Sequence, residues 1–226
     1  MPIEPVRRLA AAAQRRFAAA SRPGGDKPAG PRPFPEMGPT LKHAVAALRG
    51  AGIPHALTGA PACWVNGGPE LGIDWDLVVP PGHVDAAADV LAGAGMRVER
   101  PPEGWLLKAW DGDVLVDVIF DPLGAPVDEC LGRARVERVL GMPVPVLDPT
   151  DVAISMLLSR SAAFLEFERL LAVLRPIRER IDWDRVRAAT AGSPYAVGFL
   201  AMLDALGVAP AAAATAAPTQ PALRRA

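Results

Sequence analysis

Two apolar segments of this chain carry acidic side chains where a buried strand should have none, and this feature constrains the fold more than any other. Residues 73–79 read Ile-Asp-Trp-Asp-Leu-Val-Val, and residues 114–120 read Val-Leu-Val-Asp-Val-Ile-Phe. Side chains alternate between the two faces of a strand, so Asp74 and Asp76 share one face while the residues between them share the other. Asp117 is the single charge of the second segment. Both segments therefore predict buried strands that carry acids.

Buried carboxylates of this kind need positive charge close to them. Burial of one unpaired carboxylate is costly, and three together repel one another unless a cation collects them. Hard oxygen ligands suit Mg²⁺ or the similar Mn²⁺, and two carboxylates on one strand with a third on its neighbour could hold such an ion. The sequence therefore predicts a divalent metal site built from Asp74, Asp76 and Asp117.

A second part of the pattern lies upstream. Residues 53–58, Ile-Pro-His-Ala-Leu-Thr, predict a short strand, and Gly59 and Ala60 follow it as a small-residue turn. Without bulky side chains, the backbone N–H groups of such a turn can approach a phosphate, and the hydroxyl of Thr58 could line the same pocket. An ordinary strand-to-helix turn would explain the same residues almost equally well.

The order of these features resembles the nucleotidyltransferase superfamily of the DNA-polymerase-beta type. The features are a strand, a small-residue turn, Asp-x-Asp and a third acid on a later strand. The resemblance is to its small bacterial branch, which includes toxin-like members. Gly59-Ala60, Asp74-x-Asp76 and Asp117 carry the resemblance, which spans about residues 40–120. It implies transfer of a nucleoside monophosphate from a nucleoside triphosphate such as ATP to a hydroxyl of a small molecule, a tRNA or a protein.

The resemblance also implies roles for single residues. Asp74 and Asp76 would hold the metal together with the triphosphate, and Asp117 would complete the site and assist deprotonation of the acceptor hydroxyl. Lys108, on a predicted strand, either faces the phosphates or is a solvated lysine. The three acids are thus the predicted catalytic and metal-binding residues. The predicted nucleotide-binding residues are Thr58, Gly59, Ala60 and Lys108.

The sequence departs from the superfamily pattern just before the first Asp. Many relatives of the small bacterial branch carry Arg-x-Thr or Arg-x-Ser there, whereas this chain has Glu70-Leu71-Gly72. A negative charge near a polyphosphate weakens its binding, so the sequence predicts weak nucleotide affinity that Glu70→Arg with Gly72→Ser would improve. This departure favours an alternative function, a nucleotidyltransferase-like binding or regulatory module, while the three intact acids favour an enzyme.

Length, charge and cysteine content narrow the class of protein. The 226 residues suffice for one or two domains, and the formal net charge is −1. Residues 1–40 hold seven Lys/Arg and three acids, a charge of +4, so the rest carries −5, which argues against a large non-specific nucleic-acid surface. Cys63 and Cys130 lack metal-type spacing, which predicts a reducing, cytoplasmic location. No apolar run approaches the length of a membrane span.

By composition the chain divides into four parts. Residues 1–39 are a basic Ala/Arg-rich stretch and a Pro/Gly linker, predicted as a flexible arm that is either solvated or contacts RNA or another acidic partner. Residues 40–147 are the nucleotidyltransferase-like domain, and residues 148–208 are predicted to be helical. Residues 209–226 are Ala/Pro/Thr-rich and predicted to be disordered. The predicted fold class is α/β, a mixed sheet with helices on one face and a C-terminal helical region beside it.

Turn signals and hydrophobic period predict the elements of the second part. Gly52 and Gly95 close two expected helices, and Asp111-Gly112 is a hairpin signal. The expected helices are 41–51, with Thr40 as N-cap, and 84–94, with a short helical piece at 61–65. The expected strands are 53–58, 73–79, 96–100, 105–110 and 114–120, with a small extra hairpin formed by 136–140 and 144–147.

Overall fold

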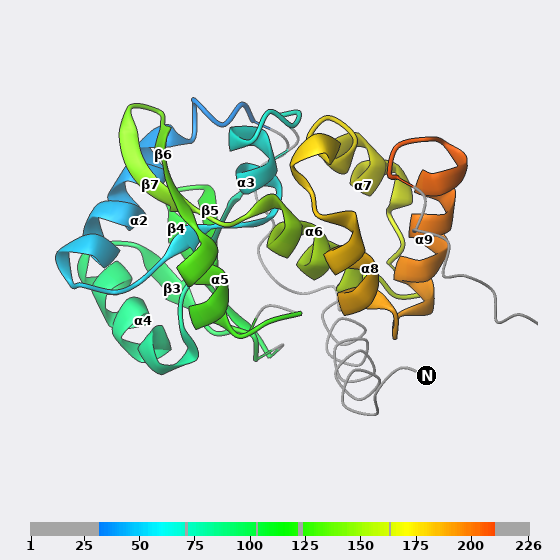
Figure 1. Ribbon diagram of the computed structural model, residues 1–226. Helices are drawn as coiled ribbons and strands as arrows, with labels where there is room; N and C mark the ends of the chain where they lie inside the picture. Colours follow the sequence, from blue (N-terminus) through cyan, green and yellow to red (C-terminus); the bar gives the residue numbers. More distant parts are fainter. Residues whose placement is uncertain (1–31, 71, 103, 122–123, 163, 211–226) are drawn as a thin grey trace, which may run out of the picture.

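A mixed sheet of seven strands forms the centre of the molecule, with helices around it and a helical region beside it (Figure 1). The computed structural model describes residues 32–70, 72–102, 104–121, 124–162 and 164–210. The predicted α/β class and the C-terminal helical region are confirmed. Most of the predicted basic arm, with its proposed RNA or acidic partner, and most of the predicted tail lie outside the described residues.

The sheet mixes parallel and antiparallel pairs in the order β3-β4-β5-β2-β1-β7-β6. β2 is parallel to β5 and β1 is parallel to β7, whereas the other neighbours are antiparallel. β4 and β5 form the hairpin that the Asp-Gly pair predicts. The strands are β1 (Ala56–Leu57), β2 (Trp75–Val78), β3 (Arg97–Glu99), β4 (Leu106–Asp111), β5 (Val114–Ile119), β6 (Arg135–Val139) and β7 (Met142–Val146).

Two features of the sheet differ from the prediction. The hairpin of β6 and β7 is not a separate extra element, because β7 pairs with β1 and completes the main sheet. The strand predicted at residues 53–58 contains only two paired residues, since Pro54 interrupts its start and the chain turns into a helix after Thr58. Helix α5 (Val127–Arg133) lies between β5 and β6 and was not predicted from the sequence.

Helices α2 (Gly38–Gly50) and α4 (Val84–Gly93) contact each other and the sheet. Trp75 points towards α2, and its indole Nε1 donates a hydrogen bond to the carbonyl oxygen of Met37 at 3.0 Å. Because side chains alternate along β2, Asp76 points to the opposite face. The short helix α3 (Gly59–Val65) follows β1 directly and contacts β2.

The N-terminal boundary of the packed domain lies earlier than predicted. Phe34 and Met37 are 0% and 2% exposed, although both fall in the segment predicted as a flexible linker. α2 begins at Gly38, with Met37 rather than Thr40 as its N-cap. The prediction of a flexible linker from Pro and Gly content is wrong at this point, because the same segment also contains two apolar side chains that are buried in the core.

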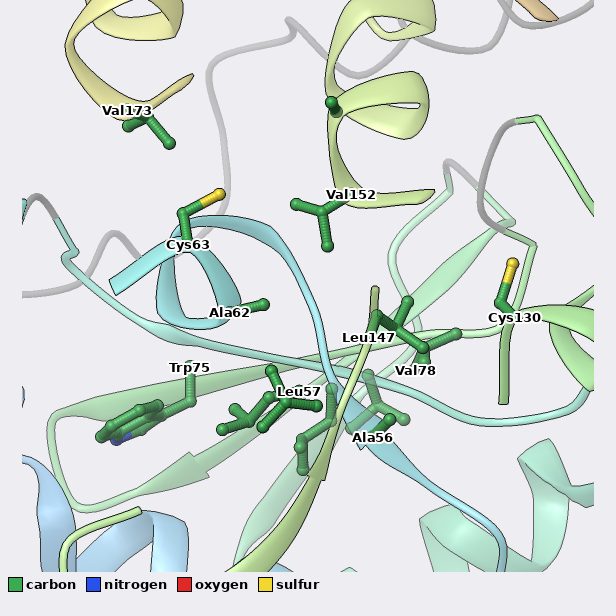
Figure 2. Packing of buried hydrophobic residues seen from close by; sticks show 14 of the residues in the cluster. Ala56, Leu57, Ala62, Cys63, Trp75, Val78, Cys130, Leu147, Val152 and Val173 are labelled. Carbon is green, nitrogen blue, oxygen red and sulfur yellow. The ribbon is translucent and has the colours of Figure 1, made fainter. Parts of the chain in front are cut away.

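The C-terminal helices share one hydrophobic core with the sheet. In Figure 2, Val152 of α6 and Val173 of α7 point towards Cys63 of α3. The packed part extends through Ala209, which is 5% exposed, so it passes the predicted boundary at residue 208 by one residue. The helices of this region are α6 (Pro149–Leu158), α7 (Phe167–Leu174), α8 (Trp183–Thr190) and α9 (Pro194–Ala205), with the 3₁₀ turn η2 (Arg178–Arg180) between α7 and α8. A second 3₁₀ turn, η1 (Pro81–His83), precedes α4.

A buried carboxylate also joins the two regions. Asp151 of α6 has a side chain that is only 3% exposed, and it accepts hydrogen bonds from Arg133 of α5 and from Arg185 of α8. The carboxylate of Asp151 thus links α5, α6 and α8. None of the helices in the described ranges combines the length and apolar character needed to cross a membrane.

Candidate functional site

Three carboxylates meet on the face of the sheet opposite Trp75. Asp76 of β2 and Asp117 of β5 are direct partners in the parallel register, so their side chains point the same way. Asp74 lies two residues before Asp76, just ahead of the first paired residue of β2, and therefore on the same side. One carboxylate oxygen from each of the three lies within 4.8 Å of those from the other two. We call these three residues the acid cluster.

The acid cluster is electrostatically unfavourable without a cation. Burial raises the pKa of Asp76 well above its ordinary value, and the charges of Asp74 and Asp117 raise it further. Burial also raises the pKa of Asp74. Three oxygen donors that converge and repel one another are the donor set that a hard divalent cation requires. The residues therefore fit a divalent metal ion.

Gly59 makes the approach of Asp76 possible. Its φ is +60°, in the left-handed region, and a Cβ built on it would lie 2.2 Å from Oδ2 of Asp76. The backbone N–H of Ala60 donates a hydrogen bond to the Asp76 carboxylate. The turn predicted to receive a phosphate thus holds a carboxylate of the acid cluster, and this explains why small residues are needed there.

Cationic side chains reach the acid cluster from two directions. Lys108 of β4 is the direct register partner of Asp117 and so lies on the same face of the sheet. Arg169 comes from α7, in the helical region, and its charge opposes the rise in pKa that burial causes at both Asp74 and Asp76. Sequence reasoning did not identify Arg169, because no local pattern distinguishes it from the other arginines of the helices.

A cavity of about 160 Å³ opens beside Asp76, between the sheet and α6. Thr58 and Gly59, two of the residues predicted to bind the nucleotide, line it together with Asp121, which follows β5. Its lining combines apolar and hydroxyl side chains from segments that the sequence analysis did not connect with the acids. The further lining residues are Trp105, Ile119, Val152, Ser155, Met156 and Ser159.

Glu70 and Gly72, which stand just before the first Asp of the acid cluster, have structural roles. The carboxylate of Glu70 accepts a hydrogen bond from the backbone N–H of Phe34 at 2.5 Å. A Cβ at Gly72 would lie 2.1 Å from Cζ of Phe34, whose ring fills the space above the glycine. The substitution Gly72→Ser, one half of the double change predicted from the sequence to improve nucleotide binding, would therefore clash with a buried ring, which corrects that part of the prediction.

Comparison with known proteins gives likeness at the level of whole structures. No protein-family model matches the chain, and no curated protein matches its sequence significantly. A solution structure of the antibiotic-resistance factor ANT(2'')-Ia has 17% identity and a TM-score of 0.42, covering 74% of this chain and 92% of that one. A crystal structure of ANT(2'')-Ia in complex with adenylyl-2''-tobramycin has 17% identity and a TM-score of 0.44, covering 73% and 97%.

An antigenic nucleotidyltransferase-like protein from Paracoccidioides brasiliensis is also similar, with 14% identity and a TM-score of 0.39, covering 74% of this chain and 87% of that one. These three similar structures are of an antibiotic-resistance factor and of a nucleotidyltransferase-like protein, and their likeness to this chain is one of fold.

Proposed function

We propose that this protein is a Mg²⁺- or Mn²⁺-dependent nucleotidyltransferase, which transfers a nucleoside monophosphate from a nucleoside triphosphate to an acceptor hydroxyl. The observation that carries the proposal is the convergence of Asp74, Asp76 and Asp117 on one face of the sheet, beside a cavity. A stable fold gains nothing from three half-buried carboxylates that repel one another, and their placement supports a bound cation and a reaction that uses it.

Each acid has a distinct role in the proposed reaction. Asp74 and Asp76 would hold the cation, and Gly59 and Ala60 fix the orientation of the second of them. When bound, a divalent cation would neutralise charge at the α-phosphate and on the departing pyrophosphate. Asp117, the register partner of Asp76, would accept the proton of the attacking hydroxyl as the bond to the α-phosphorus forms.

The cavity beside the acid cluster would hold an organic part of the substrates. Trp105 and Met156 offer apolar surface for a ring, and the hydroxyls of Thr58 and Ser155 offer hydrogen-bond partners. Because Asp76 also lines this cavity, a group bound there lies next to the proposed metal ligands. The acceptor, whether a small molecule, a tRNA or a protein, must present its hydroxyl at this point.

A second function is a nucleotidyltransferase-like module that binds without transfer. The observation that favours it is the packing of Phe34 on Gly72, which leaves no space there for the superfamily's hydroxyl side chain. Incubation with each α-labelled nucleoside triphosphate, a divalent metal and cell extract separates the two functions. Transfer of label to a component of the extract supports the enzyme, whereas binding of nucleotide without transfer supports the module.

The metal part of the proposal is tested by thermal stability. A carboxyl whose pKa is raised on folding binds its proton more tightly in the folded state, so the metal-free protein loses stability as the pH rises from the ordinary carboxyl range towards the raised pKa. At neutral pH, Mg²⁺ or Mn²⁺ should therefore raise the Tm, and a nucleoside triphosphate should raise it further.

The variant Asp74→Asn with Asp76→Asn should abolish the metal effect and stabilise the metal-free protein, because it removes the repulsion. Asp89→Asn is the matched control, since Asp89 is exposed on α4 and is not part of the acid cluster. It should leave the response to metal unchanged. A wild-type Tm that responds to neither metal nor nucleotide would refute the proposed site.

A further inference from the structure

The motif region contributes no positive charge to the polyphosphate that the proposed function requires. Between Arg49 and Arg97 the sequence contains no lysine or arginine. The acid cluster adds negative charge in the same place, and Glu70 is held on the backbone of Phe34. A triphosphate bound beside these acids therefore needs cations from other parts of the chain.

The position of Arg169 on α7 meets this need. Val173, one turn further along α7, packs in the core shared with α3, and it points towards Cys63 in Figure 2. Residues four apart lie on the same face of a helix, so Arg169 projects from the side of α7 that faces α3. α3 begins at Gly59, where Asp76 is held. Arg169 is exposed, so its guanidinium is accessible from solvent.

Electrostatics agree with this placement. Burial raises the pKa of Asp74, and the charges of Arg169 and Lys108 oppose that rise. Arg160, the arginine that precedes Arg169 in the sequence, already has its own partners: it is 7% exposed, pairs with Glu166 at 3.3 Å and lies over the ring of Phe164. A buried and fully engaged arginine cannot move to a ligand without loss of these contacts.

We infer that Arg169 binds the polyphosphate of the nucleotide and supplies, from the helical region, the charge that superfamily relatives place before the first Asp. This inference rests on the proposed function. Lys108 lies on the sheet and Arg169 on α7, so a triphosphate bound by both connects the sheet with the helical region. Guanidinium is suited to this because its planar fork donates two hydrogen bonds to one phosphate.

The test compares the affinity for ATP, ADP and AMP by calorimetry in the presence of Mn²⁺. Arg169→Ala should weaken ATP binding by about ten- to a hundredfold, the range for charge-assisted hydrogen bonds, and ADP binding by less, with AMP binding unchanged. Arg169→Lys should recover part of the loss. The control is Arg175→Ala, which removes an exposed arginine at the end of the same helix and should leave all three affinities unchanged.

Each outcome has one reading. If Arg169→Ala binds ATP as tightly as Arg175→Ala does, or loses AMP and ATP affinity equally, the inference is wrong, while nucleotide binding by the wild type keeps the proposed function. If the wild type binds no nucleotide, the proposed function is refuted and this inference falls with it. Far-ultraviolet circular dichroism and the Tm of each variant show that the fold is retained.

Discussion

The packing of Phe34 on Gly72 gives the sharpest test of how this fold is held together. The ring is fully buried, with its centroid 4.9 Å from the rings of both Trp64 and Trp75. A Cβ at Gly72 would lie 2.1 Å from Cζ and 2.2 Å from Cε1 of that ring. Real Cβ atoms do not come this close to a neighbour, so Gly72→Ala must displace a ring that is enclosed on its other sides.

The expected magnitudes follow from this geometry. Phe34→Ala removes a fully buried ring and should lower the free energy of unfolding by about 3–5 kcal/mol. Gly72→Ala overpacks the same space and should cost about 1–3 kcal/mol. In the double variant the new methyl group enters space vacated by the ring, so Gly72→Ala should cost close to nothing there. The coupling energy of the pair should therefore equal the cost of Gly72→Ala alone.

Urea unfolding of the wild type, both single variants and the double variant measures this coupling. Gly198→Ala is the control, since Gly198 is exposed on α9 with no atom within 4 Å of the added Cβ. That change should stabilise the protein by about 0.5–1 kcal/mol through helix propensity. If the effects of Phe34→Ala and Gly72→Ala add within about 0.5 kcal/mol, the two residues do not compete for space and the reasoning is refuted.

Three other perturbations test the remaining parts of the structure. Deletion of residues 1–39 should lower the Tm by at least about 6 °C relative to deletion of residues 1–31, because only the longer deletion removes Phe34. Equal Tm values for the two deletions would contradict the role of Phe34 in the core. Burial lowers the pKa of His55, so as the pH falls the unfolded chain binds a proton before the folded protein does, and the free energy of unfolding should fall below about pH 6.5. His55→Gln should reduce the slope of the urea midpoint against pH in this range, and an unchanged slope would contradict the role of His55. Asp151→Ala leaves two guanidiniums without their shared carboxylate and should cost about 3 kcal/mol in urea unfolding; a cost below about 1 kcal/mol would show that this carboxylate does not join the two regions.

The acid cluster could be predicted from the sequence because it depends on a local rule. Alternation along a strand places Asp74 and Asp76 on one side, and a lone charge in the apolar run around Asp117 marks a second strand of the same kind. The Asp-Gly hairpin between β4 and β5 is equally local, and it brings Lys108 opposite Asp117. The fold class followed from the order of these elements.

Other features were decided only by tertiary structure. Whether Phe34 belongs to a linker or to the core depends on Gly72 and two tryptophans, which lie at least thirty residues away in the sequence. The approach of Arg169 to the acids depends on how α7 packs against α3. Hydrophobic period shows which face of an element is buried, but it does not show which distant surface will bury it. Local sequence therefore determined the strands and their acids, and long-range packing determined which side chains surround them.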